Sequence, residues 1–179
     1  GFDQGQLTRN ILSMGKKHLI QQGGEVRQNM QEIEALARNM AFPTSYHTRG
    51  RWAYDVASGA KTLDGLQAHM VEWAKDKYAE NTQVVRGLER GLTMWDIVQP
   101  TLGRVAEELG MSVDAFKLTE GRGAQLLNYR DPTSGETRLM NDSEATAFAR
   151  SQREWRDTNT GKGLAAQLVD GITKKYGRR

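Results

Sequence analysis

The sequence contains no cysteine, only three histidines and three prolines, and no long apolar run. Without cysteine the chain has no disulfide, no cysteine nucleophile and no thiolate metal site. His18, His47 and His69 lie far apart in the sequence, which argues against a zinc site built from histidines. No apolar run approaches the ~20 residues that cross a bilayer. We therefore predict a soluble protein without metal, other cofactor or membrane span, and place it in the cytoplasm by default.

The 179 residues fit one domain, and a hydrophobic content of 37% allows a modest core. We predict a single mainly helical domain over residues 1–179. The alternative is a division into a helical part at residues 1–98 and a second part at residues 99–179. Because the chain begins with Gly1 and not with methionine, we expect it to be a segment of a larger protein.

Apolar residues recur at three- and four-residue steps along much of the chain, as in helices with one buried face. Helices are expected over residues 4–22, 25–40, 62–80, 81–98, 143–157 and 164–176. Gly23 and Gly24 predict the connection between the first two. Gly87 and Gly91 weaken the helix over 81–98 by about 1 kcal/mol each. They indicate either the close approach of another backbone or a break into two pieces.

Residues 42–61 interrupt this periodicity and are predicted to form a loop. The candidate binding residues of the loop are Tyr46, His47, Arg49, Arg51, Trp52 and Tyr54. Aromatic rings interleaved with arginine suit stacking on bases or on a peptide, while arginine pairs with phosphate or carboxylate. His47 and Asp55 would form an acid–base pair if the loop folds back on itself. In the alternative interpretation the aromatic residues anchor the loop to the helices and both arginines face water.

Residues 94–121 suggest two helices joined by a turn. Pro100 should end one helix, Thr101 should cap the next, and Gly110 should form a turn before a helix over residues 112–121. The segment VAEELGMSVDAFK resembles the helix-turn-helix of DNA-binding proteins. The resemblance implies DNA binding, with Lys117 and Arg122 as candidate binding residues. An ordinary pair of packed helices is the alternative.

A small β-hairpin is predicted at about residues 125–140, because the turn residues of DPTSGE separate the runs LLNYR and TRLM. Behind a helix-turn-helix, such a hairpin would serve as a DNA-binding wing. The charge of the segment opposes this function. Residues 99–150 contain six cationic and eight acidic side chains, whereas phosphate binding requires an excess of cations.

The same segment also resembles the active-site segment of phage-type lysozymes, through Glu120-Gly121, Tyr129-x-Asp131, Gly135 and Thr137. The resemblance implies a peptidoglycan glycosidase with Glu120 as the general acid and with Asp131 and Thr137 serving the other face of the sugar. The chain departs from the family pattern in the wider separation of Glu120 and Asp131. The sequence RLMND also replaces the expected glycine-rich strand. A helix-ending Glu-Gly and a solvated hairpin are the alternative.

The last 29 residues are basic, with seven cations against three acids over residues 151–179. Such a segment suits nucleic acid, an anionic membrane surface or an acidic protein. Taken together, the sequence predicts a helical interaction module from a larger protein, which binds a protein or nucleic-acid partner through residues 42–61. A protein partner is the first expectation and enzymatic activity is not expected. The DNA-binding helix-turn-helix and the lysozyme-like glycosidase stay open as alternatives.

Overall fold

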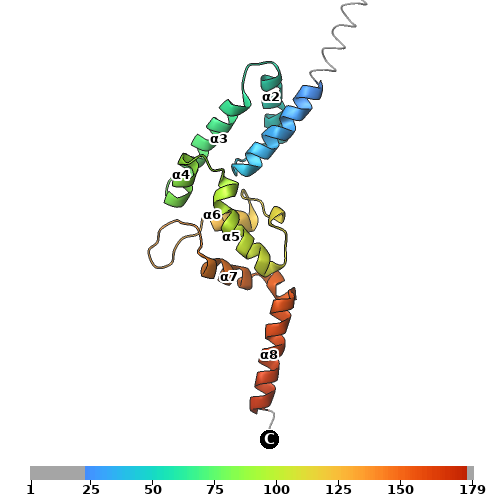
Figure 1. The fold of residues 1–179 in the computed structure, drawn as a ribbon, viewed down its shortest axis with the longest axis vertical. Coiled ribbons are helices and arrows are strands. Elements are labelled where there is room, and N and C mark those ends of the chain that lie inside the picture. The colour runs from blue at the N-terminus through green and yellow to red at the C-terminus, as the bar shows by residue number, and fades with distance from the viewer. Residues whose placement is uncertain (1–22, 177–179) are drawn as a thin grey trace, which may run out of the picture. The chain divides into compact units, whose positions relative to one another are not determined.

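The computed structural model describes residues 23–176 and is mainly helical (Figure 1). The chain divides into two compact units, one ending at Ala74 and the other beginning at Lys75. The mainly helical class is confirmed. The helix predicted over residues 4–22 lies outside the described residues. Gly23 and Gly24 are themselves helical, so the connection predicted there is wrong.

The first unit contains a helix over residues 23–39, helix α2 (Tyr46–Ala57) and most of helix α3 (Leu63–Lys77). Its α3 agrees with the helix predicted to begin at Thr62, whose hydroxyl oxygen accepts a hydrogen bond from the backbone N–H of Gly65 at 3.1 Å. One face of each helix supplies the core. The buried side chains include Ile33, Ala37, Met40, Trp52, Ala53, Leu66 and Met70.

The helix over residues 23–39 ends in an unusual way at Ala41. This residue has a φ of 52°, a left-handed conformation that helix ends normally give to glycine. The N–H of Phe42 donates to the carbonyl of Ala37 at 2.8 Å, and the N–H of Ala41 donates to the carbonyl of Arg38 at 3.2 Å. These two bonds satisfy carbonyls at the helix end and reverse the chain toward α2.

The second unit is built around helix α5 (Met94–Leu109), which packs on three other helices. These are α4 (Thr82–Glu89), α6 (Gly121–Leu127) and α7 (Asp142–Ser151). Two short 3₁₀ helices, η1 (Val113–Ala115) and η2 (Arg153–Asp157), join these elements to each other and to α8 (Asn159–Tyr176). Figure 1 shows α5 beside α6 and α7.

Of the two alternatives for Gly87 and Gly91, the structure shows a break into two helices. Gly91 has a φ of 82° and lies between α4 and α5. Thr93 then begins α5 with a capping box, because its hydroxyl and the Asp96 carboxylate each accept from the other residue's backbone N–H. Gly87 permits close packing of the two helices, since a methyl group there would lie 2.5 Å from the side chain of Ile97.

The helix boundary predicted at Pro100 is wrong, because α5 runs through this residue. Pro100 lacks an N–H and costs the helix one internal hydrogen bond. The buried face of α5 nevertheless continues across it, from Val98 to Leu102, and both side chains are fully buried. Thr101 caps nothing, and its hydroxyl donates to the carbonyl of Met140 at 3.3 Å.

The predicted β-hairpin at residues 125–140 is also wrong. The described part of the chain contains no strand in this region, only an isolated bridge between Arg130 and Thr137. Leu126 and Leu127, expected in the first strand, belong to α6 and are fully buried there. Burial of these two leucines in a helix leaves too few residues for a paired strand before the turn.

Candidate interaction surface

The segment predicted as a binding loop is largely helical, because residues 46–57 form α2. Ser45 caps this helix, its hydroxyl oxygen accepting from the N–H of Thr48 at 3.1 Å. Only Trp52 and Ala53 are fully buried in α2, so the apolar periodicity that signals a helix is weak here. The helix sorts the six candidate binding residues into two groups with different surroundings.

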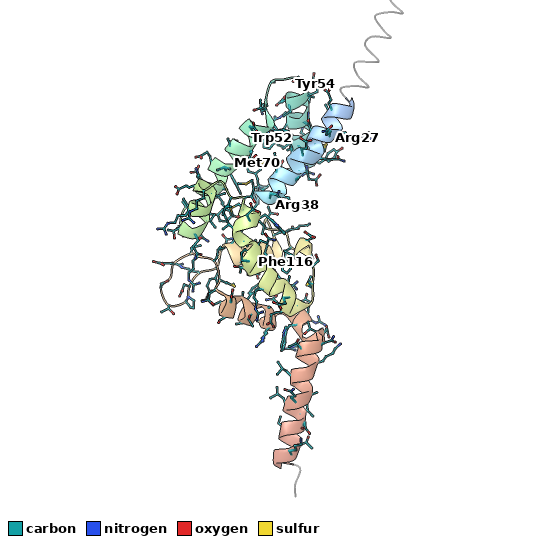
Figure 2. All side chains as sticks on the ribbon, viewed as in Figure 1. Arg27, Arg38, Trp52, Tyr54, Met70 and Phe116 are labelled. Atoms are coloured by element: carbon teal, nitrogen blue, oxygen red, sulfur yellow. The ribbon has the colours of Figure 1, made fainter. Side chains whose placement is uncertain are left out.

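Trp52 belongs to the core of the first unit and is only 8% exposed. Its ring centroid lies 5.9 Å from that of Phe42 and 6.3 Å from that of His69, in tilted and edge-on contacts. Trp52 is labelled in Figure 2. Phe42 in turn meets the ring of Trp73 edge-on at 4.9 Å. This cluster joins α2 to α3, which makes Trp52 a packing residue. The candidate binding role of Trp52 stays a prediction, and its ring lies in the core of the unit.

Arg49 is also engaged within the unit. Its Nη1 donates to the carbonyl of Thr44 at 3.1 Å, and its Nη2 lies 3.9 Å from a carboxylate oxygen of Glu34. The Nε of Arg49 is buried and has no hydrogen-bond partner among the described residues. Arg49 therefore fixes the start of α2 against the preceding helix and is not available to a ligand.

The opposite side of α2 carries the other four candidates. Tyr46 is 74% exposed and Tyr54 is 58% exposed, and His47 and Arg51 are exposed beside them. At about 100° per residue, Tyr54 lies about 80° round the helix from Tyr46, and His47 and Arg51 lie within about 60° of Tyr54. Gly50 lies between the two tyrosines, and a methyl group there would meet nothing within 4 Å. We call Tyr46, His47, Arg51 and Tyr54 the α2 face.

The expected acid–base pair of His47 and Asp55 is not present. The carboxylate of Asp55 pairs with Lys61 at 3.2 Å, beyond the end of the helix. The ammonium of Lys61 also lies 5.7 Å from the ring of Trp52. Trp52, Lys61 and His69 line a cavity of about 630 Å³ between the end of α2 and α3.

The helix-turn-helix candidates have partners within the second unit. The helix expected over residues 112–121 is wrong, since only the 3₁₀ turn Val113–Ala115 forms after Gly110. Lys117 pairs with Glu120 at 2.7 Å. Arg122 donates to Gln152 at 3.3 Å and forms an ion pair with Glu154. A second helix that could enter a DNA groove is thus missing from this described segment.

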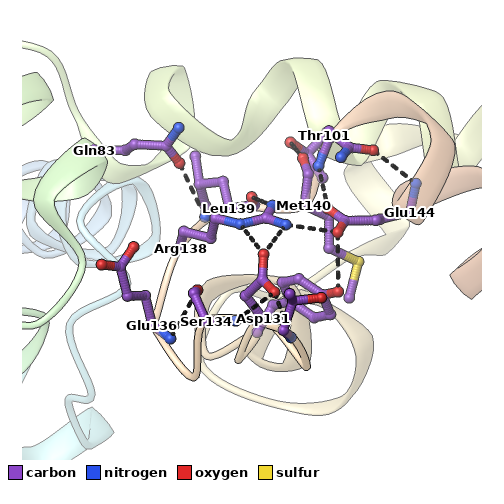
Figure 3. A network of polar contacts seen from close by, with 12 residues as sticks. Gln83, Thr101, Asp131, Ser134, Glu136, Arg138, Leu139, Met140 and Glu144 are labelled. Carbon is purple, nitrogen blue, oxygen red and sulfur yellow. Dashed lines mark hydrogen bonds and ion pairs between the residues drawn. The ribbon is translucent and has the colours of Figure 1, made fainter.

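The lysozyme-like residues have three different sets of partners. Glu120 is 64% exposed and paired with Lys117. The carboxylate of Asp131 accepts from Nε of Arg138 at 2.8 Å, and the hydroxyl of Thr137 donates to Glu80 at 3.3 Å (Figure 3 shows the Asp131 contacts). Hydrogen bonds from Arg138 and from two backbone N–H groups lower the pKa of Asp131. A lowered pKa keeps the Asp131 carboxylate ionised, and this carboxylate is engaged by Arg138 within the loop.

Arg138 is a central residue that the sequence did not single out. Its guanidinium donates to both Asp131 and Glu144 (Figure 3). It also lies 5.3 Å from the ring of Tyr129. The Tyr129 hydroxyl donates to Glu144 at 3.1 Å. These contacts order the loop between α6 and α7. The alternation of aromatic and charged residues around Tyr129 is the signal in the sequence. The pairing of Arg138 with Asp131 and Glu144 depends on how the loop folds.

The described residues hold no group of three or more His, Asp or Glu side chains arranged to bind a metal ion. Among the same residues, no helix combines the length and apolar character required to cross a bilayer. The exposure of two tyrosines and an arginine makes the α2 face the candidate site. Comparison with known proteins adds no relative, since no family model, curated protein or solved structure matches the chain.

Proposed function

We propose that the chain is an interaction module that binds a protein partner through the α2 face. The observation that carries this proposal is the exposure of Tyr46 and Tyr54 on one side of a helix whose other side is packed. Two large aromatic side chains in water, eight residues apart, are about 12 Å apart along the helix axis. Tyrosine and arginine are the residues that most often carry binding energy in protein interfaces.

The geometry of the α2 face favours a partner that lies along the helix. Gly50 lies between Tyr46 and Tyr54 in the sequence of the helix, and a methyl group there would meet nothing within 4 Å. An apolar side chain of a partner would pack against the exposed rings. Arg51 would pair with a carboxylate at the edge of the contact. Burial at the centre and a charged rim are typical of specific protein interfaces.

Charge favours protein over nucleic acid as the partner. The sequence of the first unit, residues 1–74, has eight cations and seven acids. Two of these cations, Arg49 and Lys61, are already in ion pairs, and Arg51 is the one formal cation of the α2 face. Nucleic-acid binding depends on several cations that neutralise successive phosphates. One arginine between two tyrosines is better matched to a protein surface than to the phosphates of a nucleic acid.

Site-specific photo-crosslinking tests the proposal. A photoreactive amino acid replaces Tyr46 or Tyr54 in the full chain, and an extract of the source organism is irradiated with it. We expect a discrete protein adduct from both positions. The additional substitution Arg51→Ala should strongly reduce the yield of the adduct, since truncation of a hot-spot arginine costs about 2 kcal/mol or more of binding free energy.

The matched control places the photoreactive residue at Gln67, an exposed position on α3 of the same unit. The same adduct from position 67 would mean that the crosslinking is not specific to the α2 face. An adduct that nuclease treatment removes would assign the face to nucleic acid. Absence of any adduct at positions 46 and 54 would reject the proposal.

A further inference from the structure

Helix α8 presents an apolar face that nothing in the described chain covers. Leu164, Leu168, Val169 and Ile172 are 40%, 66%, 65% and 58% exposed. They fall on one side of the helix at steps of four, one and three residues. The main contact of α8 within its unit is through its first turn, where Gly161 lies against the carbonyl of Trp155 in η2.

The composition of α8 makes an external support necessary. Gly161, Gly163 and Gly171 lie within its 18 residues, and each costs about 1 kcal/mol relative to alanine in a helix. An isolated helix of this length is marginal in water and depends on packing of its apolar face. Since the fold buries only the first turn, the remaining apolar face requires another surface to cover it.

The charge of this segment indicates what kind of surface that is. Residues 159–179 contain five cations and one acid. The acid, Asp170, is neutralised by Lys174, whose ammonium donates to its carboxylate at 2.6 Å. The segment is therefore attracted to an anionic surface and repelled by a second copy of itself. A helix of 18 residues is about 27 Å long, enough to lie in a membrane interface along its whole length.

We propose that α8 docks in the plane of an anionic lipid surface, with Leu164, Leu168, Val169 and Ile172 in the acyl boundary and the cations at the phosphates. All four exposed apolar side chains are aliphatic, whereas protein hot spots prefer tryptophan, tyrosine and arginine. A basic helix with one broad aliphatic face is typical of interfacial membrane binding.

Flotation of the full chain with lipid vesicles tests the proposal. The vesicles consist of phosphatidylcholine alone or of phosphatidylcholine and phosphatidylglycerol in equal parts. We expect binding to the anionic vesicles, little binding to the neutral ones, and a gain of helical circular dichroism on binding. Leu168→Asp should weaken binding at least about fiftyfold, because it removes a buried leucine and adds a repelled charge.

The matched control is Gln167→Asp, which adds the same charge one residue away on the polar side of α8. It should weaken binding by no more than about fivefold, the effect of one charge near the surface. Equal loss in the two variants would overturn the proposal, because binding would then be electrostatic only. Failure to float with anionic vesicles would also overturn it and favour an acidic protein. A dimer in light scattering that Leu168→Asp dissociates would assign the face to a second copy.

Discussion

Arg138 and Glu144 tie the loop between α6 and α7 to the first turn of α7. Nη1 of Arg138 donates to Oε2 of Glu144 at 2.7 Å, and Nη2 donates to Oε1 at 2.6 Å. The same carboxylate accepts from the backbone N–H of Asn141 at 2.9 Å and completes the capping box of α7. One carboxylate therefore serves both as a helix cap and as the anchor of the loop.

This pairing predicts a loss of stability in acid. The hydrogen bonds from Arg138 lower the pKa of Glu144 from 4.5 to about 2 in the folded protein. Because the folded pKa lies below the unfolded one, the contribution of Glu144 is complete above about pH 4.5 and is lost as the pH falls toward about 2. Urea unfolding should show that Glu144→Gln lowers the free energy of unfolding at about pH 7. The variant should also show a smaller difference in this free energy between about pH 7 and about pH 3 than the parent protein does.

The control for this experiment is Glu136→Gln, which removes an exposed carboxylate from the same loop. It should keep the pH dependence of the parent protein. If Glu144→Gln and Glu136→Gln flatten the pH dependence equally, the bidentate pair with Arg138 does not stabilise the fold.

The two sides of α2 should respond differently to truncation. Trp52→Ala removes a ring from the cluster with Phe42 and His69 and should destabilise the first unit by about 3–5 kcal/mol. Tyr54→Ala, two residues further on at a position that is 58% exposed, should change stability by no more than about 0.5 kcal/mol. Urea unfolding followed by circular dichroism measures both. A loss of several kcal/mol in Tyr54→Ala would place its ring in the core and remove it from the α2 face.

Two helical glycines of the second unit should respond in opposite ways to substitution by alanine. A methyl group at Gly123 in α6 would lie 2.3 Å from the backbone oxygen of Lys117, so Gly123→Ala should cost about 1–3 kcal/mol. Gly103 in α5 has nothing within 4 Å of that position, and Gly103→Ala should stabilise the protein by about 0.5–1 kcal/mol. Thermal unfolding of the two variants gives the sign of each effect. Stabilisation by both would show that the backbone at Lys117 can move away.

Asn81 connects α4 to α6 from a fully buried position. Its Oδ1 accepts from the N–H of Val84 at 3.3 Å, and its Nδ2 donates to the carbonyl of Leu127 at 3.4 Å. Asn81→Ala should therefore cost about 2–3 kcal/mol, the loss of a cap together with an unsatisfied buried carbonyl. The exposed cap of α7 is the control, since Asn141→Ala should cost only about 1 kcal/mol. Equal costs would mean that the bond to Leu127 contributes nothing.

Features that depend on neighbouring residues in the chain were predicted well. The beginning of α3 at Thr62 follows from a local side-chain-to-backbone bond. The break between α4 and α5, one of the two alternatives for Gly87 and Gly91, follows from one backbone conformation at Gly91. Four of the six candidate residues of segment 42–61 are exposed, as a binding role requires. The existence of a mixed aromatic and cationic segment was visible from composition alone.

The tertiary structure decided which of these residues remain free for a partner. Trp52 and Tyr54 are two residues apart in a segment with no clear period, and a turn of about 200° between them in a helix directs one inward and the other to solvent. Likewise, Pro100 stays inside α5 and Leu126 stays in α6 because burial against neighbouring helices outweighs local preference. Such burial is a property of surfaces brought together by folding, so it has no signature within a short stretch of sequence.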